Sequence, residues 1–255
     1  MILALDVGNT NIVLGGIEGD EIRFSERLST VLRKTSMEYA MSIKSILDLH
    51  QVHPGDVTGS IISSVVPPIT GSLCEAIRKL TDCDPLIVGP GMKSGLNIRM
   101  DQPAQVGADL IAAAVAAIAQ YPCPVILIDM GTATTITVVD EDKSFIGGMI
   151  LPGLAASLES LTSRTSQLPR ISLDPPKKII GKNTEDCMKS GILYGNASCL
   201  DGMIDRIGEE MGVSPFIVAT GGLSHTVVPL CRHEITIDDD LLLKGLMIIY
   251  HKNCG

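Results

Sequence analysis

Apolar residues in this chain form short runs, typical of buried β-strands, and longer stretches with helical spacing. The first run, ILALDVGNTNIVLGGI at residues 2–17, stops at Asp6, passes through the polar cluster Gly8-Asn9-Thr10 and resumes at Ile12. Two apolar segments joined by such a cluster predict a β-hairpin. This hairpin would carry a carboxylate at the end of its first strand.

The same pattern occurs again about half the chain later. Residues 125–139, VILIDMGTATTITVV, align on the first hairpin without gaps, so that Asp129 falls on Asp6 and Thr132 on Asn9. The spacing between the two copies is about half the chain, which is too long for a solenoid and predicts two homologous domains. A single copy would suit an ordinary turn in which Asp caps its own loop. Two copies in register favour a ligand site.

The remaining pattern fits two α/β halves. We expect strands at 60–70, 85–89 and 215–220, helices at 72–80, 107–121, 186–212 and 240–253, and a strand, a turn and a helix within 145–169. The halves, residues 1–121 and 122–255, join near Tyr121-Pro122 without a low-complexity linker. Hairpins followed by crossover helices predict a mixed sheet flanked by helices in each half. The cleft between the halves is the expected ligand site.

Composition narrows the class of protein. The chain has 255 residues, a hydrophobic fraction of 45%, and an aromatic fraction of only 3% with no Trp, which predicts aliphatic α/β packing. A net charge of −9 without a basic block argues against binding to nucleic acid. Neither a secretory signal peptide nor a membrane span is expected, since the run Leu110 to Ala119 is about half the roughly 20 residues needed. Seven cysteines without a CxxC pair predict reduced thiols in a cytoplasmic protein.

The two turns offer chemistry for an anion and a cation. Glycine lets the backbone approach a ligand closely. Successive N–H groups, with Asn9, Thr10, Thr132 and Thr134 beside them, would form a concavity that binds anions. An Asp at the end of each first strand could hold a cation beside a phosphate, directly or through water.

Taken together, the motifs resemble the superfamily of actin, sugar kinases and heat-shock ATPases. Within it they resemble type III pantothenate kinases, which make 4′-phosphopantothenate, the first step of coenzyme A synthesis. The resemblance covers essentially the whole chain and includes SSVVP (63–67), VGAD (106–109), DMGTATT (129–135), GGMILPGL (147–154), TSQLP (165–169), IGKNT (180–184), ATGGL (219–223) and LLLKGL (241–246).

This resemblance implies two ribonuclease-H-like, actin-like ATPase domains and a cytoplasmic homodimer whose interface lies in the second half. It implies ATP as co-substrate, Mg²⁺, a monovalent cation (K⁺ or NH₄⁺) and pantothenate as acceptor. The nucleotide would be bound by Asp6, Val7, Gly8, Asn9, Thr10, Asn11, Ile12, Val13 and Thr132. The substrate would be bound by Met100, Gly107, Ala108, Asp109, Leu110 and Thr184.

Three aspartates would have distinct roles by the same resemblance. Asp6 would hold the magnesium that accompanies ATP, Asp129 the monovalent cation, and Asp109 would act as the general base. Thr184 would reach the substrate across the dimer interface.

Plain structural roles compete with some of these assignments. Asp109 and Thr184 each suit the N-terminal cap of a helix. Gly221-Gly222 could admit an adenine ring or could form only a strand-to-helix turn. The five histidines lack metal-binding spacing.

The segment MDQPAQVGADL departs from the family pattern. The family has Tyr where this chain has Met100 and Arg where it has Leu110, and Gln102 and Gln105 also differ. An Arg is a strong partner for a carboxylate, so Arg99 is a candidate replacement. The alternatives are a kinase for a related hydroxy acid and a non-catalytic regulatory paralogue that assists transcription. The presence of Asp6, Asp109 and Asp129 weighs against the second alternative.

Overall fold

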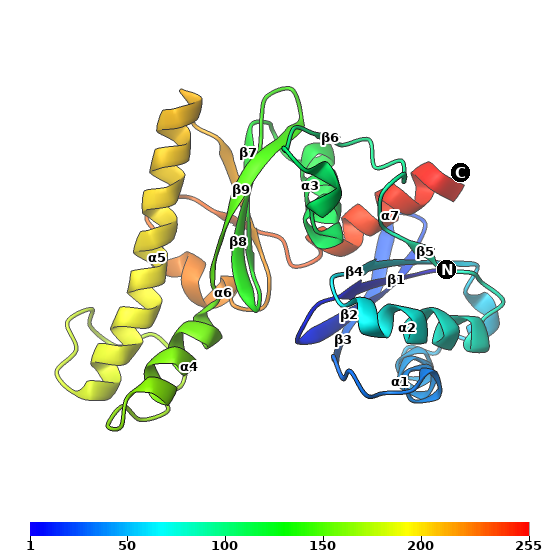
Figure 1. Ribbon diagram of the computed structural model, residues 1–255, viewed down its shortest axis with the longest axis horizontal. Helices are drawn as coiled ribbons and strands as arrows, with labels where there is room; N and C mark the ends of the chain where they lie inside the picture. The colour runs from blue at the N-terminus through cyan, green and yellow to red at the C-terminus, as the bar shows by residue number, and fades with distance from the viewer. Residues whose placement is uncertain (255) are drawn as a thin grey trace. The chain divides into compact units, whose positions relative to one another are not determined.

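The computed structural model describes residues 1–254, which form two compact units (Figure 1). The first unit comprises Met1–Leu96, Met100–Ala119 and the segment that starts at Asp240; the second comprises Asn97–Arg99 and Gln120–Asp239. Each unit is a mixed sheet with helices packed on it, so the predicted α/β class is confirmed. The C-terminal segment thus belongs to the same unit as the N-terminus.

The sheet of the first unit has the strand order β3-β2-β1-β4-β5. Its strands are β1 (Ile2–Val7), β2 (Asn11–Glu18), β3 (Glu21–Ser29), β4 (Gly59–Ser64) and β5 (Leu86–Ile87). The first three form an antiparallel meander, and β4 and β5 run parallel to β1. The central strand β1 therefore has an antiparallel neighbour on one side and a parallel neighbour on the other.

The second sheet repeats this topology. Its strands are β7 (Val125–Met130), β8 (Ala133–Val139), β9 (Ser144–Pro152), β10 (Phe216–Thr220) and β11 (Thr236–Ile237). The order β11-β10-β7-β8-β9 has the same strand directions as the first sheet, with β7 in the place of β1. The short strand β6 (Asn97–Ile98) adds to the outer edge, parallel to β9.

The two hairpins differ by one residue in their turns. In the first, the Gly8 N–H donates to the Asn11 carbonyl at 3.0 Å, which leaves two residues at the tip. In the second, the Gly131 N–H donates to the Ala133 carbonyl at 3.0 Å, which leaves only Thr132. The gapless alignment therefore holds only as far as the glycine.

Because the second turn is one residue shorter, the side chains that follow it point to the face of the sheet opposite to the one that the gapless alignment predicts. Thr134 pairs with Met130 and is buried in the sheet, where its counterpart in the first hairpin is the core residue Ile12. Thr134 is thus buried and not exposed at the tip of the turn, and its place in the anion-binding concavity stays a prediction.

Helices cover both faces of the first sheet. On one face, α1 (Ser36–Leu49) and α2 (Pro67–Leu80) enclose an aliphatic core. On the other, α3 (Ala108–Gln120) and α7 (Leu241–Cys254) form a second core. Helix α2 begins five residues before the start that we expected, because proline is tolerated in the first turn of a helix.

Helix α1 was not predicted, although the sequence carries its start signal. Thr35 and Glu38 form a capping box, in which each side chain binds the other residue's backbone N–H. The apolar positions that follow, including Tyr39, Ile43 and Leu47, have helical spacing and are buried.

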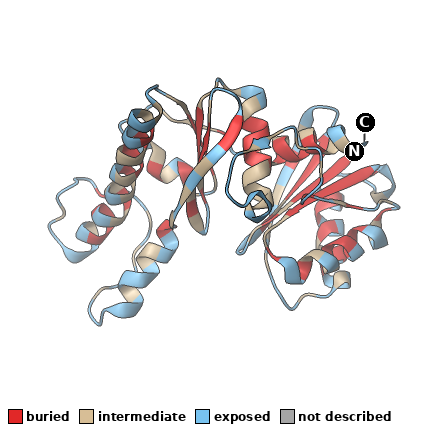
Figure 2. Ribbon diagram, turned by 45° about the horizontal axis from the view of Figure 1, so that its top comes forward, coloured by how far each residue is buried: buried red, intermediate tan, exposed pale blue. Residues whose placement is uncertain are grey.

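In the second unit, α4 (Leu154–Arg164), α5 (Thr184–Met211) and the short α6 (Ser224–Val227) accompany the sheet. Helix α5 has a buried stripe of Leu193, Ala197, Leu200 and Ile204 that belongs to one core with the sheet. Single 3₁₀ turns occur at Pro54–Asp56, Pro103–Gln105 and Val228–Leu230. Figure 2 shows buried residues concentrated in the strands and on the helix faces that pack on them. None of the helices within residues 1–254 is long and apolar enough to cross a membrane.

Candidate functional site

Asp6 is a half-buried carboxylate near the end of β1. Side chains alternate along a strand, so Asp6 shares its face with Ile2 and Ala4, which belong to the core under α3 and α7. Its neighbours in register are Val13 on β2 and Ser63 on β4. Asp6 therefore extends an otherwise apolar face at the edge where the β1–β2 turn begins.

The β1–β2 turn is held by contacts that the sequence did not reveal. The Thr30 hydroxyl donates to the Gly8 carbonyl at 2.6 Å, and the Thr30 N–H donates to the Thr10 carbonyl at 2.9 Å. A Cβ on Gly8 would lie 3.1 Å from the Asn11 carbonyl oxygen, so glycine allows this close turn. Two of its carbonyls are fixed, and the exposed tip at Asn9-Thr10 can present N–H groups to an anion.

Not every residue assigned to the nucleotide presents its side chain there. Val7 and Ile12 are fully buried in the core under α1 and α2. Val13 packs on the opposite face, beside Asp6. Val7 and Ile12 can therefore contact a nucleotide only through their backbone.

The second turn is enclosed by two glycines from other segments. Gly221 follows β10 with φ +91°, and a Cβ on it would lie 2.6 Å from Asp129 Oδ1 and 2.7 Å from the Met130 backbone. Gly153, the N-cap of α4, lies against the carbonyl groups of Gly131 and Thr132. The segments that contain these two glycines thus meet around Asp129 and the exposed Thr132.

Asp109 is the second residue of α3 and lies in the first unit with Asp6. The Gly107 carbonyl accepts the first helical hydrogen bond, from the Ile111 N–H at 3.1 Å, so Asp109 is not the N-cap residue. Its Oδ1 accepts from the Leu110 N–H at 2.8 Å. Burial raises the pKa of the Asp109 carboxyl, and hydrogen bonds from the Leu110 and Asp109 N–H groups oppose the rise. A half-buried carboxylate with a raised pKa is suited to accept a proton.

The expected substrate segment lies next to Asp109 along the chain. Ala108 packs on the core under α3 and α7, and Leu110 is half-buried. Met100 is 37% exposed. The Arg99 guanidinium is already paired with Asp140 at 3.2 Å and with a second carboxylate, which argues against its use as a replacement for the family Arg.

Thr184 is the exposed first residue of α5, and the prediction that it caps this helix is wrong. The cap is Asn183, whose Oδ1 accepts from the Asp186 N–H at 2.8 Å. The chain just before it carries two exposed apolar side chains, Ile179 at 60% and Ile180 at 79%. Thr184 therefore has no capping role to explain its presence.

The loop before Thr184 is anchored to α5 by Lys189, which is only 8% exposed. Its ammonium contacts Asp174 at 2.9 Å and Glu185 at 3.1 Å. Hydrogen bonds from the Lys189 ammonium to Asp174 and Glu185 raise the pKa of Lys189. The Ser190 hydroxyl donates to the Ile179 carbonyl. These contacts fix both ends of the 174–179 segment.

The residues around Asp6 fit a magnesium ion that a nucleotide carries with it. Within the described chain, no three His, Cys, Asp or Glu side chains converge as a metal site. Magnesium in phosphoryl-transfer enzymes is commonly held by one or two carboxylates, water and substrate phosphates, which needs no such cluster. The Ser63 hydroxyl beside Asp6 is fully buried and has no hydrogen-bond partner within residues 1–254, so an unsatisfied oxygen lies there.

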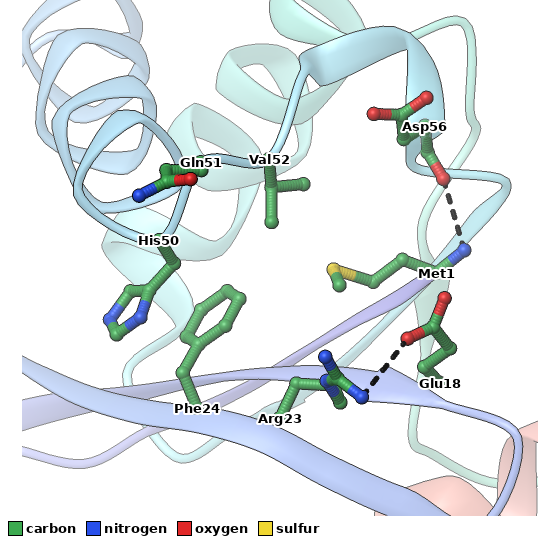
Figure 3. A pocket seen from close by; sticks show the side chains of 8 residues that line it. All are labelled: Met1, Glu18, Arg23, Phe24, His50, Gln51, Val52 and Asp56. Carbon is green, nitrogen blue, oxygen red and sulfur yellow. Dashed lines mark hydrogen bonds and ion pairs between the residues drawn. The ribbon is translucent and has the colours of Figure 1, made fainter.

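A surface pocket of about 430 Å³ lies elsewhere in the first unit (Figure 3). It is lined by Met1, Glu18, Arg23, Phe24, His50, Gln51, Val52 and Asp56. Phe24 stacks on His50 at 4.2 Å between ring centroids, and Arg23 pairs with Glu18 at 3.7 Å. The pocket is at the end of the hairpin opposite Asp6, and none of the predicted site residues lines it.

The sequence did not predict Ser63 and Thr30 as neighbours of the first turn. Ser63 had a signal in the sequence, because it is the next-to-last residue of an apolar strand, as Asp6 is in β1. Thr30 had none, since its role depends on where β3 returns beside the turn.

Two sheets of repeated topology, each with an aspartate near the end of its central strand and a glycine turn beyond it, define the actin-like ATPase class. A solved structure of the activator of 2-hydroxyisocaproyl-CoA dehydratase from Clostridium difficile, with bound ADPNP, has this fold. It superposes with a TM-score of 0.57 at 13% identity, over 98% of this chain and 94% of that one.

Sequence comparison then gives the family. The model for type III pantothenate kinase matches residues 2–206. Type III pantothenate kinases of Halalkalibacterium halodurans and of a Geobacillus species are each 46% identical over 253 residues. The matches cover 99% of this chain and 100% and 98% of those proteins. The chain belongs to the type III pantothenate kinase family.

Proposed function

We propose that the protein transfers the terminal phosphoryl group of ATP to the hydroxyl of pantothenate, the first step of coenzyme A synthesis. The observation that carries this proposal is that Asp6, the fixed glycine turn after it and the half-buried Asp109 all belong to the first unit of a chain of this family. Phosphoryl transfer needs positioned phosphates, neutralised charge and a carboxylate near the attacking hydroxyl, more than covalent chemistry.

Asp109 is the general base in this proposal. Its Oδ1 is held by the Leu110 N–H, which fixes the orientation of the carboxyl group. The other carboxylate oxygen, Oδ2, accepts the proton of the pantothenate hydroxyl while the hydroxyl oxygen attacks the terminal phosphorus of ATP. Burial raises the pKa of Asp109 and so makes the carboxylate a stronger base.

The β1–β2 turn binds the phosphates through the N–H groups at its tip, while Thr30 holds the turn rigid. Asp6 would hold magnesium, which supplies charge neutralisation to the phosphates when bound. In the second unit, Thr132 at the turn tip is assigned to phosphate and Asp129 to potassium or ammonium. With only 20 Lys and Arg in an acidic chain, amides and cations take the place of a lysine cradle.

We assign Thr184 to the substrate across a homodimer interface. In support, it is exposed, it is not needed as a helix cap, and two exposed isoleucines precede it. Ile180→Asp should convert the dimer to a monomer in sedimentation experiments and raise KM for pantothenate. A dimer that survives the substitution would place the interface elsewhere.

We assign the protein to the cytoplasm, which its seven free cysteines favour.

Substrate identity is tested most directly with purified protein. ADP release from ATP is measured with pantothenate, with related hydroxy acids and amides, and without acceptor. Turnover that depends on pantothenate is the expected result. Turnover with another hydroxy acid and not with pantothenate would mean that the protein is a kinase with a different substrate. No turnover with any acceptor would favour a regulatory protein.

A further inference from the structure

Ser63 carries a buried hydroxyl next to the site that we propose for magnesium. It lies on β4, directly opposite Asp6 in the parallel register with β1. Paired residues of neighbouring strands point to the same face and are separated by roughly 4.8 Å along the hydrogen-bonding direction. The Ser63 side chain is 0% exposed, and its Oγ has no hydrogen-bond partner among the described residues.

A buried hydroxyl without a partner is destabilising, because it loses its hydrogen bonds to water and gains none in exchange. Such groups are rare in native proteins, and a water or ion that binds there is one explanation. Ser63 is the next-to-last residue of β4, beside a carboxylate for which we propose a magnesium ion. The Ser63 hydroxyl therefore lies next to the Asp6 carboxylate, on the same face of the sheet.

The second sheet repeats this pairing. Asp129 has Thr220 opposite it on the parallel strand β10, and Thr220 is only 2% exposed. Since β10 occupies the place of β4, Ser63 and Thr220 are topological counterparts. The antiparallel neighbours of the two aspartates, Val13 and Thr135, do not match in chemistry. A buried hydroxyl beside the aspartate is thus a feature that both units share.

We infer that Ser63 is a second residue of the magnesium–nucleotide site, where its hydroxyl hydrogen-bonds the hydrated ion that Asp6 holds. This inference rests on the proposed function of Asp6. It makes Ser63 a positioning residue whose contribution depends on the metal.

Ser60 provides a matched control on the same strand. It is also a buried serine, 1% exposed, and its Oγ also has no hydrogen-bond partner in the part of the chain that the structure describes. Ser60 pairs with Leu3, however, so it lies on the opposite face of the sheet and away from Asp6. Removing either hydroxyl should leave the melting temperature of the unliganded protein unchanged or slightly raised.

The test is calorimetric titration of the full-length protein with ADP, with magnesium and with EDTA. Ser63→Ala should weaken Mg-ADP binding about five- to tenfold, the loss expected for one hydrogen bond, and leave metal-free ADP binding unchanged. Ser63→Thr should bind Mg-ADP like the wild type, as the threonine at 220 suggests, and Ser60→Ala should do the same. Ser63→Cys, a close steric match with a weak donor, replaces the alanine variant if that variant does not fold.

Three contrary outcomes have distinct meanings. Wild-type affinity in Ser63→Ala, with weakened Mg-ADP binding in Asp6→Asn, would overturn the role of Ser63 alone. Unchanged Mg-ADP binding in Asp6→Asn would overturn the proposed function of Asp6 itself. If Ser63→Ala weakened ADP binding equally with magnesium and with EDTA, the hydroxyl would contact the nucleotide itself, and the proposed contact with the metal would be wrong.

Discussion

Gly221 lies directly against the carboxylate of Asp129, so that a Cβ at position 221 would come within 2.6 Å of Oδ1. The glycine also has φ +91°, a conformation that side chains with a Cβ rarely adopt. The position of Asp129 thus depends on a residue that is distant in sequence and contributes only backbone.

Gly221→Ala should displace the Asp129 carboxylate and lower the unfolding free energy by about 1–3 kcal/mol, through backbone strain. The assay is kinase activity against potassium concentration at fixed magnesium, where half-activation should need more potassium. Gly212→Ala is the control, because Gly212 has φ +70° but none of the described atoms would lie within 4 Å of a Cβ there. That variant should lose stability and keep its response to potassium. If both variants respond to potassium like the wild type, Asp129 does not hold the cation.

Asp109→Asn should lower kcat by about 10²- to 10⁴-fold, since the general base is lost while the amide oxygen can still accept from the Leu110 N–H. Steady-state kinetics and ADP binding measured on the same preparation distinguish the loss of the general base from misfolding. More than about a tenth of wild-type kcat would leave Asp109 with a structural role only.

The same variant predicts a pH dependence of stability. Because burial raises the pKa of Asp109, the folded state prefers the protonated form, and ionisation at neutral pH costs stability. Wild-type stability from this group is therefore greatest below the unfolded-state pKa of about 3.9 and falls as pH rises through the folded-state value. Asp109→Asn should melt at the same or a higher temperature than wild type at pH 7, and this gain should vanish at acid pH. A lower melting temperature at pH 7 would contradict the sign.

Thr184→Ala should raise KM for pantothenate about tenfold or more, the loss of a hydrogen bond to a charged group, with little change for ATP. Asn183→Ala provides the contrast, since it removes the cap of α5 and should cost about 1 kcal/mol of stability. Initial-rate kinetics and thermal melts of both variants are needed. An unchanged KM in Thr184→Ala would remove this residue from the substrate site.

Leu110→Arg tests the departure from the family pattern. Leu110 has no charge, and Arg99 is engaged with two carboxylates, so neither supplies a cation for the pantothenate carboxylate. Restoring a guanidinium at 110 should lower KM for pantothenate, with kcat little changed. Leu110→Met, similar in length and uncharged, should behave like wild type. Equal KM values in the two variants would mean that position 110 does not face the substrate.

The sequence predicted what depends on local pattern. Asp6 and Asp129 could be recognised because each interrupts an apolar strand before a glycine turn, and the two copies supported each other. Features that depend on how strands pair could not be recognised. The shorter second turn, which buries Thr134, differs from the first by one residue, and sequence alignment without gaps conceals that difference.

Caps and contacts between distant segments were also beyond the pattern. Asn183 and Thr184 are both plausible caps, and only the backbone shows that α5 begins after Asn183. Ser63 and Thr30 gain their importance from neighbours on other strands, since β4 places one beside Asp6 and β3 brings the other to the turn.

The return of α7 to the first unit has a consequence for how the polypeptide folds as it is synthesised. Leu243 and Leu246 cover the same face as Ile2 and Ala4, yet they leave the ribosome only after the whole second unit has been made. At 5–20 residues per second, the part of that face that α3 leaves for α7 to cover stays exposed for on the order of ten seconds after α3 has emerged. During this interval the nascent chain exposes a sheet surface made of aliphatic residues. A chaperone that binds nascent chains should therefore bind this one most strongly before residue 241 emerges.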